Sequence, residues 1–410
     1  MTTDLRVLSA AESDAWFGCL QLAFGGILFS PESREMYAAL AEPQRALAHW
    51  DGADCVGTAG SYSFRLTVPG GAAVPAAGVT GVSVSSTHRR QGLLTAMMRR
   101  QLDDVHSWGE PLAVLLASEP GIYGRFGYGA ATAEMNLRID TSLVRLALPP
   151  GTDGVRVRRS SPAQALDACE AVYGRLAAAR PGTLLRQPGW ERVPVNDPES
   201  GRKGGSALQC VLAERDGEVT GYVTFHLRPA WDDAGPRGTV AVRDLAALDP
   251  ASYAALWRYL FGIDLTTSVE CHNRPADDAV LRLVSDVRRC DVRLRDGMYV
   301  RLVELGAALE ARSYRAPVDV VLEVEDTFCP WNAGRWRLTA DAKGAATCRR
   351  TDDEPELALS VTELGAAYLG GVSLTTLAAA GKVRELRMGA RAEAALAFSS
   401  DVQPWYPHGF

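Results

Sequence analysis

The segment Arg89-Arg90-Gln91-Gly92 places two cations and a glycine between an expected strand and an expected helix. A glycine-containing turn at a helix N-terminus gathers unpaired backbone N–H groups and the positive end of the helix dipole, so it binds phosphate. The strand, over residues 78–84, is expected to present Thr80, Val82 and Val84 on one face. The helix is indicated by an apolar stripe at Leu94, Met98, Leu102 and Val105. Together with the continuous apolar run at 112–117, this order predicts a βαβ unit with a phosphate-binding turn.

Spacing excludes two other phosphate-binding patterns. The GxxxxGK[ST] pattern of nucleotide triphosphatases does not occur. Gly124-x-x-Gly127-x-Gly129 reverses the dinucleotide-binding spacing and has no βαβ unit around it. The turn instead fits R/Q-x-x-G-x-G/A, with Leu94 in the last small-residue position. It therefore resembles the pyrophosphate turn of the GCN5-related N-acetyltransferases (GNAT).

The sequence pattern divides the chain into three parts. Leu148-Pro149-Pro150-Gly151 interrupts both helix and strand patterns and marks a first boundary. Residues 238–260 again have the order strand, turn, helix, with Asp249-Pro250-Ala251-Ser252 in place of the basic turn. The remaining residues, about a hundred, suffice for a further domain. We predict an N-terminal catalytic domain over residues 1–149, a central degenerate copy over 150–300 and a C-terminal domain over 301–410.

Two longer blocks, residues 82–94 and 117–129, closely resemble the enhanced intracellular survival (Eis) family of bacterial acetyltransferases. The three-part organisation and the C-terminal Phe410 are also similar to that family, so the resemblance covers nearly the whole chain. It implies an α/β (α+β) fold with two tandem GNAT-like domains, the second of them inactive, followed by a sterol-carrier-protein-like domain. It further implies a homohexamer and acetyl-CoA as the acetyl donor.

The same resemblance names the residues that would bind acetyl-CoA. Val82 and Val84 would hydrogen-bond its pantetheine arm, and Ser118 and Glu119 lie at the end of the next strand. The pyrophosphate would be held by the side chains and amides of Arg89, Arg90, Gln91, Gly92, Leu93 and Leu94. The eight cysteines are scattered without a CxxC pair or a His-rich motif, so we expect reduced thiols and no metal site.

Transfer of acetyl from a thioester to an amine needs a neutral amine and a proton for the departing thiolate. The resemblance places Tyr123 as the general acid, with Tyr128 as a rival donor, and the carboxylate of Phe410 as the general base. A tyrosine with a pKa near 10 can protonate a thiolate whose conjugate acid has a pKa of about 8.5. A carboxylate with a pKa of about 3.5 is a weak base for an ammonium, so we expect Phe410 to orient the amine and collect its proton during attack. His408 either adds a titrating group near the site or caps it.

The expected acceptor pocket is less acidic than the resemblance implies. The family's aminoglycoside acetylators carry acidic residues where this chain has Gly409 and Ile27, although Glu32 and Glu35 remain nearby. The residues expected to line the pocket are mainly apolar: Phe24, Ile27, Leu28, Tyr37 and Trp405. We predict N-acetylation of aminoglycoside-type polyamines with relaxed regiospecificity. Acetylation of hydrophobic or arylalkyl amines, or of protein lysines, is the alternative.

Composition limits the classes of partner. The chain has 410 residues, 47% hydrophobic and 22% charged, with a formal net charge of −6. This balance gives no electrostatic reason to bind nucleic acid. No apolar run reaches the roughly 18 residues of a membrane span, and the N-terminus lacks a signal-peptide pattern. We therefore expect a cytoplasmic enzyme with a small-molecule amine substrate. A lipid-binding scaffold with vestigial transferase activity is the second class of function, and it would tolerate loss of Arg89, Gly92 and Tyr123.

Overall fold

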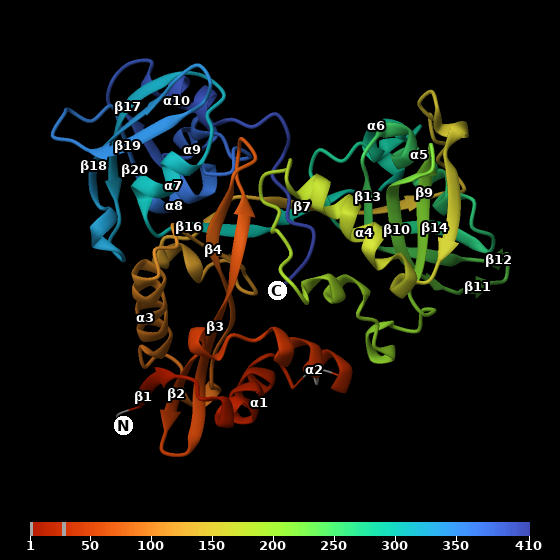
Figure 1. The fold of residues 1–410 in the computed structure, drawn as a ribbon, viewed down its shortest axis with the longest axis horizontal. Coiled ribbons are helices and arrows are strands. Elements are labelled where there is room, and N and C mark those ends of the chain that lie inside the picture. Colours follow the sequence, from red (N-terminus) through yellow and green to blue (C-terminus); the bar gives the residue numbers. More distant parts are fainter. Residues whose placement is uncertain (1–2, 27–29) are drawn as a thin grey trace.

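The N-terminal sheet carries the residues with candidate chemistry. The computed structural model describes residues 3–26 and 30–410, so Ile27 and Leu28 lie outside the described residues. Seven strands form this sheet, in which β4 and β5 are parallel (Figure 1). In sheet order they are β1 (Asp4–Val7), β2 (Leu47–Asp51), β3 (Asp54–Thr67), β4 (Ala73–Val84), β5 (Leu112–Leu116), β16 (Met298–Leu302) and β6 (Gly129–Ala130).

Three helices cover the two faces of this sheet. The first two are α1 (Ser13–Ala23) and α2 (Pro31–Leu40). The hydroxyl of Ser30 accepts from the Ser33 amide and caps α2, as the sequence predicts. On the opposite face, α3 (Leu93–Ser107) buries its apolar stripe against β4 and β5, which confirms the predicted βαβ unit. Trp16 of α1 packs beside Gly60 and Gly81 of β3 and β4, on the first face.

A bulge in β4 changes which side chains share a face. Gly81 and Val82 together lie opposite the single residue Ala59 of β3, and Gly81 adopts a positive φ of 60°. Thr80 consequently lies on the α1 face, whereas Val82 and Val84 pack with the residues of α3. The prediction of one common face for these three residues is therefore wrong, because it assumed an unbroken two-residue period.

The central domain repeats the arrangement of the first. Its seven-stranded sheet contains a parallel pair joined by a helix, and a short hairpin projects from it. In sheet order the strands are β15 (Arg293–Asp296), β7 (Ala133–Asp140), β14 (Thr266–Pro275), β13 (Gly238–Ala247), β10 (Glu218–Arg228), β9 (Gln209–Arg215) and β8 (Arg156–Ser160); the hairpin is β11 (Trp231–Asp232) with β12 (Gly235–Pro236). The helices are α4 (Pro162–Ala177), α5 (Pro250–Phe261) and α6 (Val280–Leu283).

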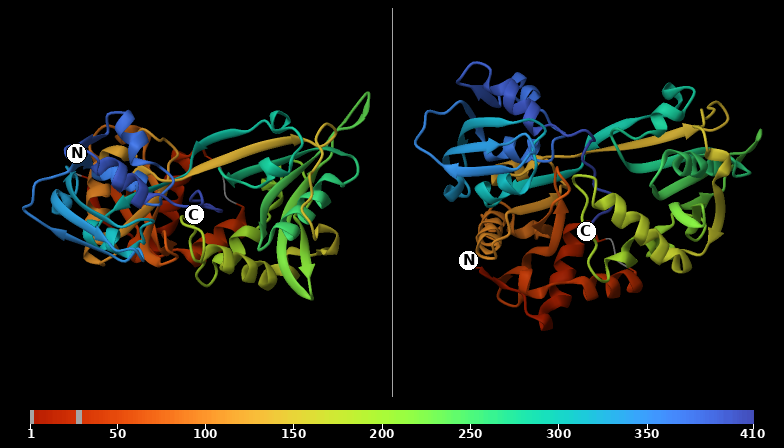
Figure 2. Two further views of the ribbon diagram at one scale, coloured as in Figure 1. Left: turned by 90° about the horizontal axis from the view of Figure 1, so that it is seen from above. Right: turned by 45° about the horizontal axis from the view of Figure 1, so that its top comes forward.

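The two sheets exchange strands across the predicted domain boundaries. β7 precedes residue 149 but pairs with β14 and β15 of the central sheet. β16 follows the central sheet in the chain but pairs with β5 and β6 of the N-terminal sheet. Figure 2 shows β7 running from the N-terminal part of the molecule toward the central domain. The composition break at 148–151 therefore does not coincide with the division of strands between sheets, because strand pairing depends on long-range contacts.

The C-terminal domain has a five-stranded sheet covered by short helices. In sheet order the strands are β19 (Ala346–Arg350), β18 (Gly334–Ala340), β17 (Val318–Glu325), β20 (Leu357–Ser360) and β21 (Val383–Glu385). The helices are α7 (Leu305–Ala311), α8 (Val361–Ala367), α9 (Leu374–Ala379) and α10 (Ala390–Phe398). Arg312 is buried among them and donates to the carbonyl oxygens of Tyr368 and Phe398 at 2.5 and 2.8 Å. In the described part of the chain, no helix has the length and apolar character needed to cross a membrane.

The last residues of the chain leave α10 without regular secondary structure. They pass between the central and N-terminal domains, and the C-terminus lies near the junction of the three domains (Figures 1 and 2). Trp405 and Tyr406 are buried on the way, and His408 is partly buried. The terminus is thus a docked segment, as its aromatic composition predicts.

Candidate active site

The basic turn has the geometry of an anion site. Arg90 and Gly92 adopt positive φ values of 62° and 87°, which turn the chain sharply into α3. No described side chain caps the first turn of this helix, so its amides are available to a ligand. Arg89 and Arg90 are exposed, and neither forms an ion pair with another described residue. This turn suits a phosphate group.

The strands next to this turn separate from each other. The parallel pairing of β4 with β5 ends at Val79 and Leu115, but β4 continues to Val84. Val82 and Val84 thus lie on a stretch paired with β3 on one side and with no described strand on the other. Such an edge pairs with the amide groups of an extended ligand. Ser118 and Glu119, just beyond the end of β5, are exposed.

The terminal residue Phe410 lies on the α1 face of β4. Thr80 Oγ1 donates a hydrogen bond of 3.1 Å to a carboxylate oxygen of Phe410. The Phe410 ring packs against Phe64, at a centroid distance of 5.1 Å, and against Tyr406 at 5.9 Å. Gly78 leaves room for this packing, since a Cβ there would lie 2.4 Å from Phe64 and 3.3 Å from Phe410. The carboxylate is therefore fixed beside the point where β4 and β5 separate.

Tyr123 lies on the other face of the same sheet. It begins a short 3-10 turn, Tyr123–Phe126, and packs in an apolar cluster with Val82 and Leu94. Burial, with a smaller contribution from the charge of Glu119, raises the pKa of its hydroxyl, so it is protonated at neutral pH. Tyr128, the rival donor, is completely buried, and burial raises its pKa strongly. Tyr123 and Phe410 thus flank the separated strands from opposite faces.

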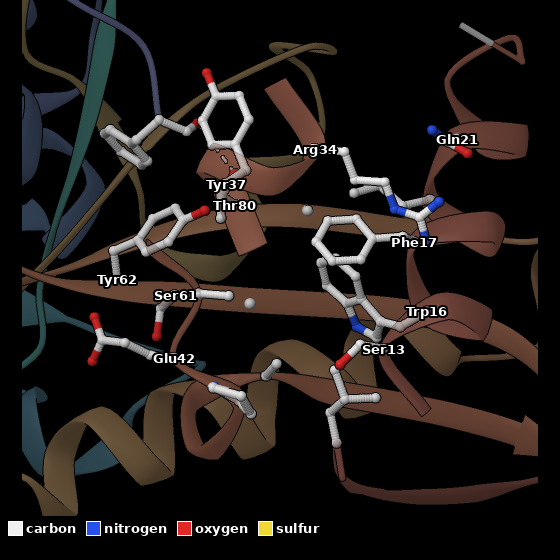
Figure 3. A pocket seen from close by; sticks show the side chains of 18 of the residues that line it. Ser13, Trp16, Phe17, Gln21, Arg34, Tyr37, Glu42, Ser61, Tyr62 and Thr80 are labelled. Atoms are coloured by element: carbon white, nitrogen blue, oxygen red, sulfur yellow. Dashed lines mark hydrogen bonds between the residues drawn. The ribbon is translucent and has the colours of Figure 1, made fainter. Parts of the chain in front are cut away.

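A cavity of about 480 Å³ extends from Phe410 between the first two helices and the sheet (Figure 3). Its wall is largely aromatic and aliphatic: Leu8, Trp16, Phe17, Leu20, Phe24, Tyr37, Tyr62 and Phe410 are among its lining residues. Burial raises the pKa values of Tyr37 and Tyr62, so both hydroxyls stay neutral. The size is that of a pocket for a small organic molecule.

Few charges face this cavity in its described lining. Among the described lining residues, Glu42 carries a carboxylate side chain. The two oxygens of that carboxylate accept from the amide and the hydroxyl of Ser63, both at 2.7 Å. Arg34 lies at the cavity (Figure 3). It forms an ion pair with Asp14, whose side chain is 91% exposed. The terminal carboxylate of Phe410 is therefore the negative group available to an incoming amine.

The predicted acceptor residues are only partly brought together. Phe24 and Tyr37 line the cavity, whereas Ile27 and Leu28 lie outside the described residues. Trp405 does not line it: its indole Nε1 donates to the Asn273 carbonyl at 2.9 Å, so this prediction is wrong. The predicted acidic pair Glu32 and Glu35 is exposed on α2 and also absent from the described lining.

Sequence reasoning missed Trp16, Phe17, Tyr62 and Thr80 as lining residues. The apolar stripe of α1 and the alternation along β3 were available signals, but neither tells which face meets the tail. His408 was left with two interpretations. Burial, with a smaller contribution from the charge of Arg186, lowers the pKa of His408 to about 3. His408 is thus neutral near pH 7, which favours the interpretation as a structural cap.

Comparisons with known proteins agree with this architecture. Family models described as "Acetyltransferase (GNAT) domain" match residues 4–131 and 182–302, and one described as "Sterol carrier protein domain" matches 305–407. They confirm the predicted fold of two GNAT domains followed by a sterol-carrier-protein-like domain.

Relatives match the chain along its whole length. It is 63% identical over 410 residues to an uncharacterized N-acetyltransferase of Streptomyces avermitilis, with both chains fully covered. It is 34% identical to the N-acetyltransferase Eis of Mycobacterium tuberculosis, covering 96% of this chain and 97% of the relative. The crystal structure of Eis1 from Mycobacterium abscessus superposes with a TM-score of 0.84 at 34% identity, covering 100% of both chains. The chain therefore belongs to the Eis family of GNAT N-acetyltransferases and is an acyltransferase.

Proposed function

We propose that this enzyme transfers acetyl from acetyl-CoA to a primary amine of a small molecule bound in the aromatic cavity. The observation that carries the proposal is the terminal carboxylate of Phe410, held by Thr80 where the cavity meets the separated strands β4 and β5. An amine at this carboxylate lies within reach of an acetyl group held between the strands.

The residues around the separated strands fit acetyl-CoA. The free edge at Val82 and Val84 suits the amides of pantetheine. The uncapped amides that follow Gly92, with Arg89 and Arg90, suit its pyrophosphate. Acetyl-CoA supplies the activated thioester, and the protein supplies alignment of the amine against it, which lowers the entropic part of the barrier.

Two groups of the chain then handle protons. The Phe410 carboxylate orients the neutral amine and collects its proton as the new C–N bond forms. Tyr123, which its burial keeps protonated, donates to the departing thiolate as the C–S bond breaks. The proton balance closes when Phe410 loses its proton and Tyr123 regains one from solvent.

The cavity wall favours one class of acceptor, an amine on an aromatic or aliphatic body. A polycation such as an aminoglycoside gains affinity from several unpaired carboxylates, whereas here Glu42 is already bonded to Ser63 and Arg34 is a cation. Aminoglycoside-type polyamines are therefore the second candidate, as weaker substrates. The lipid-binding scaffold remains the alternative class of function. The homohexamer remains a prediction of the family resemblance.

Mass spectrometry of a substrate panel tests this proposal. Purified enzyme and acetyl-CoA are incubated with a phenylalkylamine, an aminoglycoside and a lysine peptide, and the products are weighed. We expect one acetyl group on the phenylalkylamine, at the highest kcat/KM of the panel. A preference for the aminoglycoside, with repeated acetylation, would overturn the assignment of the acceptor class.

A further inference from the structure

The central domain repeats the strand separation that forms the acetyl-CoA edge in the N-terminal domain. Parallel pairing of β13 with β14 ends at Val242 and Cys271, while β13 continues to Ala247. Matching these last paired residues to Val79 and Leu115 makes Leu245 the counterpart of Val82. By the same register, Arg274 is the counterpart of Ser118.

In the central domain, side chains of the protein fill the gap between the separated strands β13 and β14. The buried Arg274 donates from Nη1 to the Leu245 carbonyl at 2.7 Å and from Nε to Asp278 at 2.7 Å. At the N-terminus of α5, the carboxylate of Asp249 accepts from the amides of Ala251 and Ser252. The Leu245 carbonyl and the first amides of α5 are therefore occupied, whereas the N-terminal domain leaves the matching groups free for a ligand. The Asp249 carboxylate lies where a phosphate would bind.

The filled gap holds the C-terminal segment. The Trp405 ring lies over the Arg274 guanidinium at 5.3 Å, and its Nε1 donates to the Asn273 carbonyl at 2.9 Å. Asn273 Nδ2 in turn donates to the Tyr406 carbonyl at 2.6 Å. Asn273 has a positive φ of 52°, so the backbone takes an uncommon conformation at the residue that bonds twice to the tail.

Further hydrogen bonds from the central domain hold the C-terminal segment. The Trp405 amide donates to the Pro181 carbonyl at 2.9 Å. Tyr173 of α4 donates its hydroxyl proton to the Leu184 carbonyl at 2.6 Å, so its oxygen accepts from His408 Nε2 at 3.2 Å. His408, which makes the last of these bonds, is two residues from Phe410, whose carboxylate accepts the hydrogen bond from Thr80.

We infer that the central domain has exchanged acetyl-CoA binding for a positioning role: its filled gap holds the C-terminal segment so that the Phe410 carboxylate reaches the active site of the N-terminal domain. Asn273 is the positioning residue of this device. The inference rests on the proposed role of Phe410. A shift of about 1 Å in a reacting group costs on the order of 100-fold in rate, so loosening the tail lowers kcat without touching the acetyl-CoA site.

Steady-state kinetics of Asn273→Gly test the inference. Glycine keeps the positive φ and removes only the side chain that bonds to Tyr406. We expect kcat to fall about tenfold or more while the KM for acetyl-CoA changes less than about twofold. The matched control is Asp216→Gly, because Asp216 has the same φ of 52° in the central domain and a side chain that is 94% exposed. Trp405→Phe, which keeps the ring over Arg274 but loses the Nε1 donor, is the second variant.

A double variant separates positioning from general damage. In an enzyme lacking Phe410, Asn273→Gly should lower kcat no further, because no carboxylate remains at position 410 to be positioned. If the kcat losses of Asn273→Gly and of Phe410 deletion multiply in the double variant, the inference is overturned. It is also overturned if kcat is unchanged in both Asn273→Gly and Trp405→Phe. If deletion of Phe410 alone leaves kcat unchanged, the proposed role of Phe410 fails instead, so the two failures are distinguishable.

Discussion

Thr80 and Phe410 lie 330 residues apart in the chain and are joined by a 3.1 Å hydrogen bond from the threonine hydroxyl to the terminal carboxylate. The bulge at Gly81 is what turns Thr80 toward the tail and Val82 away from it. One strand thereby presents a carboxylate anchor on one face and, next to it, the free edge that we propose binds acetyl-CoA.

Thr80→Val removes the hydroxyl donor and keeps the side-chain volume. A hydrogen bond to a charged group contributes about 1.5–3 kcal/mol, so loss of this one should lower kcat at least about tenfold. Thr80→Ser, which keeps a donor, should recover most of the rate. Wild-type kcat in Thr80→Val would show that the bond does not fix the carboxylate.

Gly78→Ala should destabilise the protein by about 1–3 kcal/mol, because the added Cβ would lie 2.4 Å from the Phe64 ring. Gly174→Ala is a control of opposite sign, since Gly174 is exposed within α4 and a Cβ there meets nothing within 4 Å. That control should gain about 0.5–1 kcal/mol. Urea unfolding curves of both variants measure the difference, and equal midpoints would contradict it.

The partly buried His408 should make the free energy of unfolding depend on pH. Its pKa falls from 6.5 to about 3 on folding, so between these values the unfolded chain binds a proton that the folded chain does not. The contribution to stability is complete above pH 6.5 and is lost as the pH falls. The free energy of unfolding should drop by about 2 kcal/mol from this residue between pH 7 and 5.

Comparison with His408→Gln isolates this contribution, since all other titrating groups are common to both proteins. Urea unfolding curves of both proteins at pH 7 and pH 5 give the stability that each loses on acidification. The variant should lose less stability on acidification than the wild type. Identical losses in both proteins would show that folding does not lower the pKa of His408.

Arg34→Gln should raise kcat/KM for a diamine about two- to fivefold relative to a phenylalkylamine, because a partly exposed cation contributes up to about 1 kcal/mol. Arg100→Gln is the matched control: its side chain is 46% exposed against 47% for Arg34, and both are ion-paired. The effect of Arg34→Gln should shrink at high salt. Equal changes of kcat/KM in Arg34→Gln and Arg100→Gln would show that the effect comes from the net charge of the protein and not from the position of Arg34 at the cavity.

The strand, basic turn and helix of the first βαβ unit were predictable because their determinants are local. Arg89, Gly92 and the stripe of α3 are neighbours in sequence, and the structure confirms the strand, turn and helix that they predict. The acceptor side was predictable only in part. The Gly81 bulge reversed the expected face of Thr80, and a bulge depends on the pairing of two strands.

The path of the tail could not be deduced from its own composition. An aromatic terminus predicts docking, but Trp405 finds its partners at Pro181 and Asn273, more than a hundred residues away in the chain. Its assignment to the acceptor pocket was wrong for that reason. The exchange of β7 and β16 between sheets was missed for the same cause, since strand partners are chosen by long-range packing.

Removal of Phe410 tests the central claim most directly. Three N-terminally tagged proteins are compared: the wild type, a variant that ends at Gly409 and so carries its carboxylate one residue earlier, and Phe410→Leu, which keeps the carboxylate at position 410. Acid–base groups contribute about 10²–10⁴-fold to rate, so the shortened chain should lose at least about 100-fold in kcat with acetyl-CoA affinity nearly unchanged. Phe410→Leu should retain most of its turnover. Full turnover in the chain that ends at Gly409 would contradict the account.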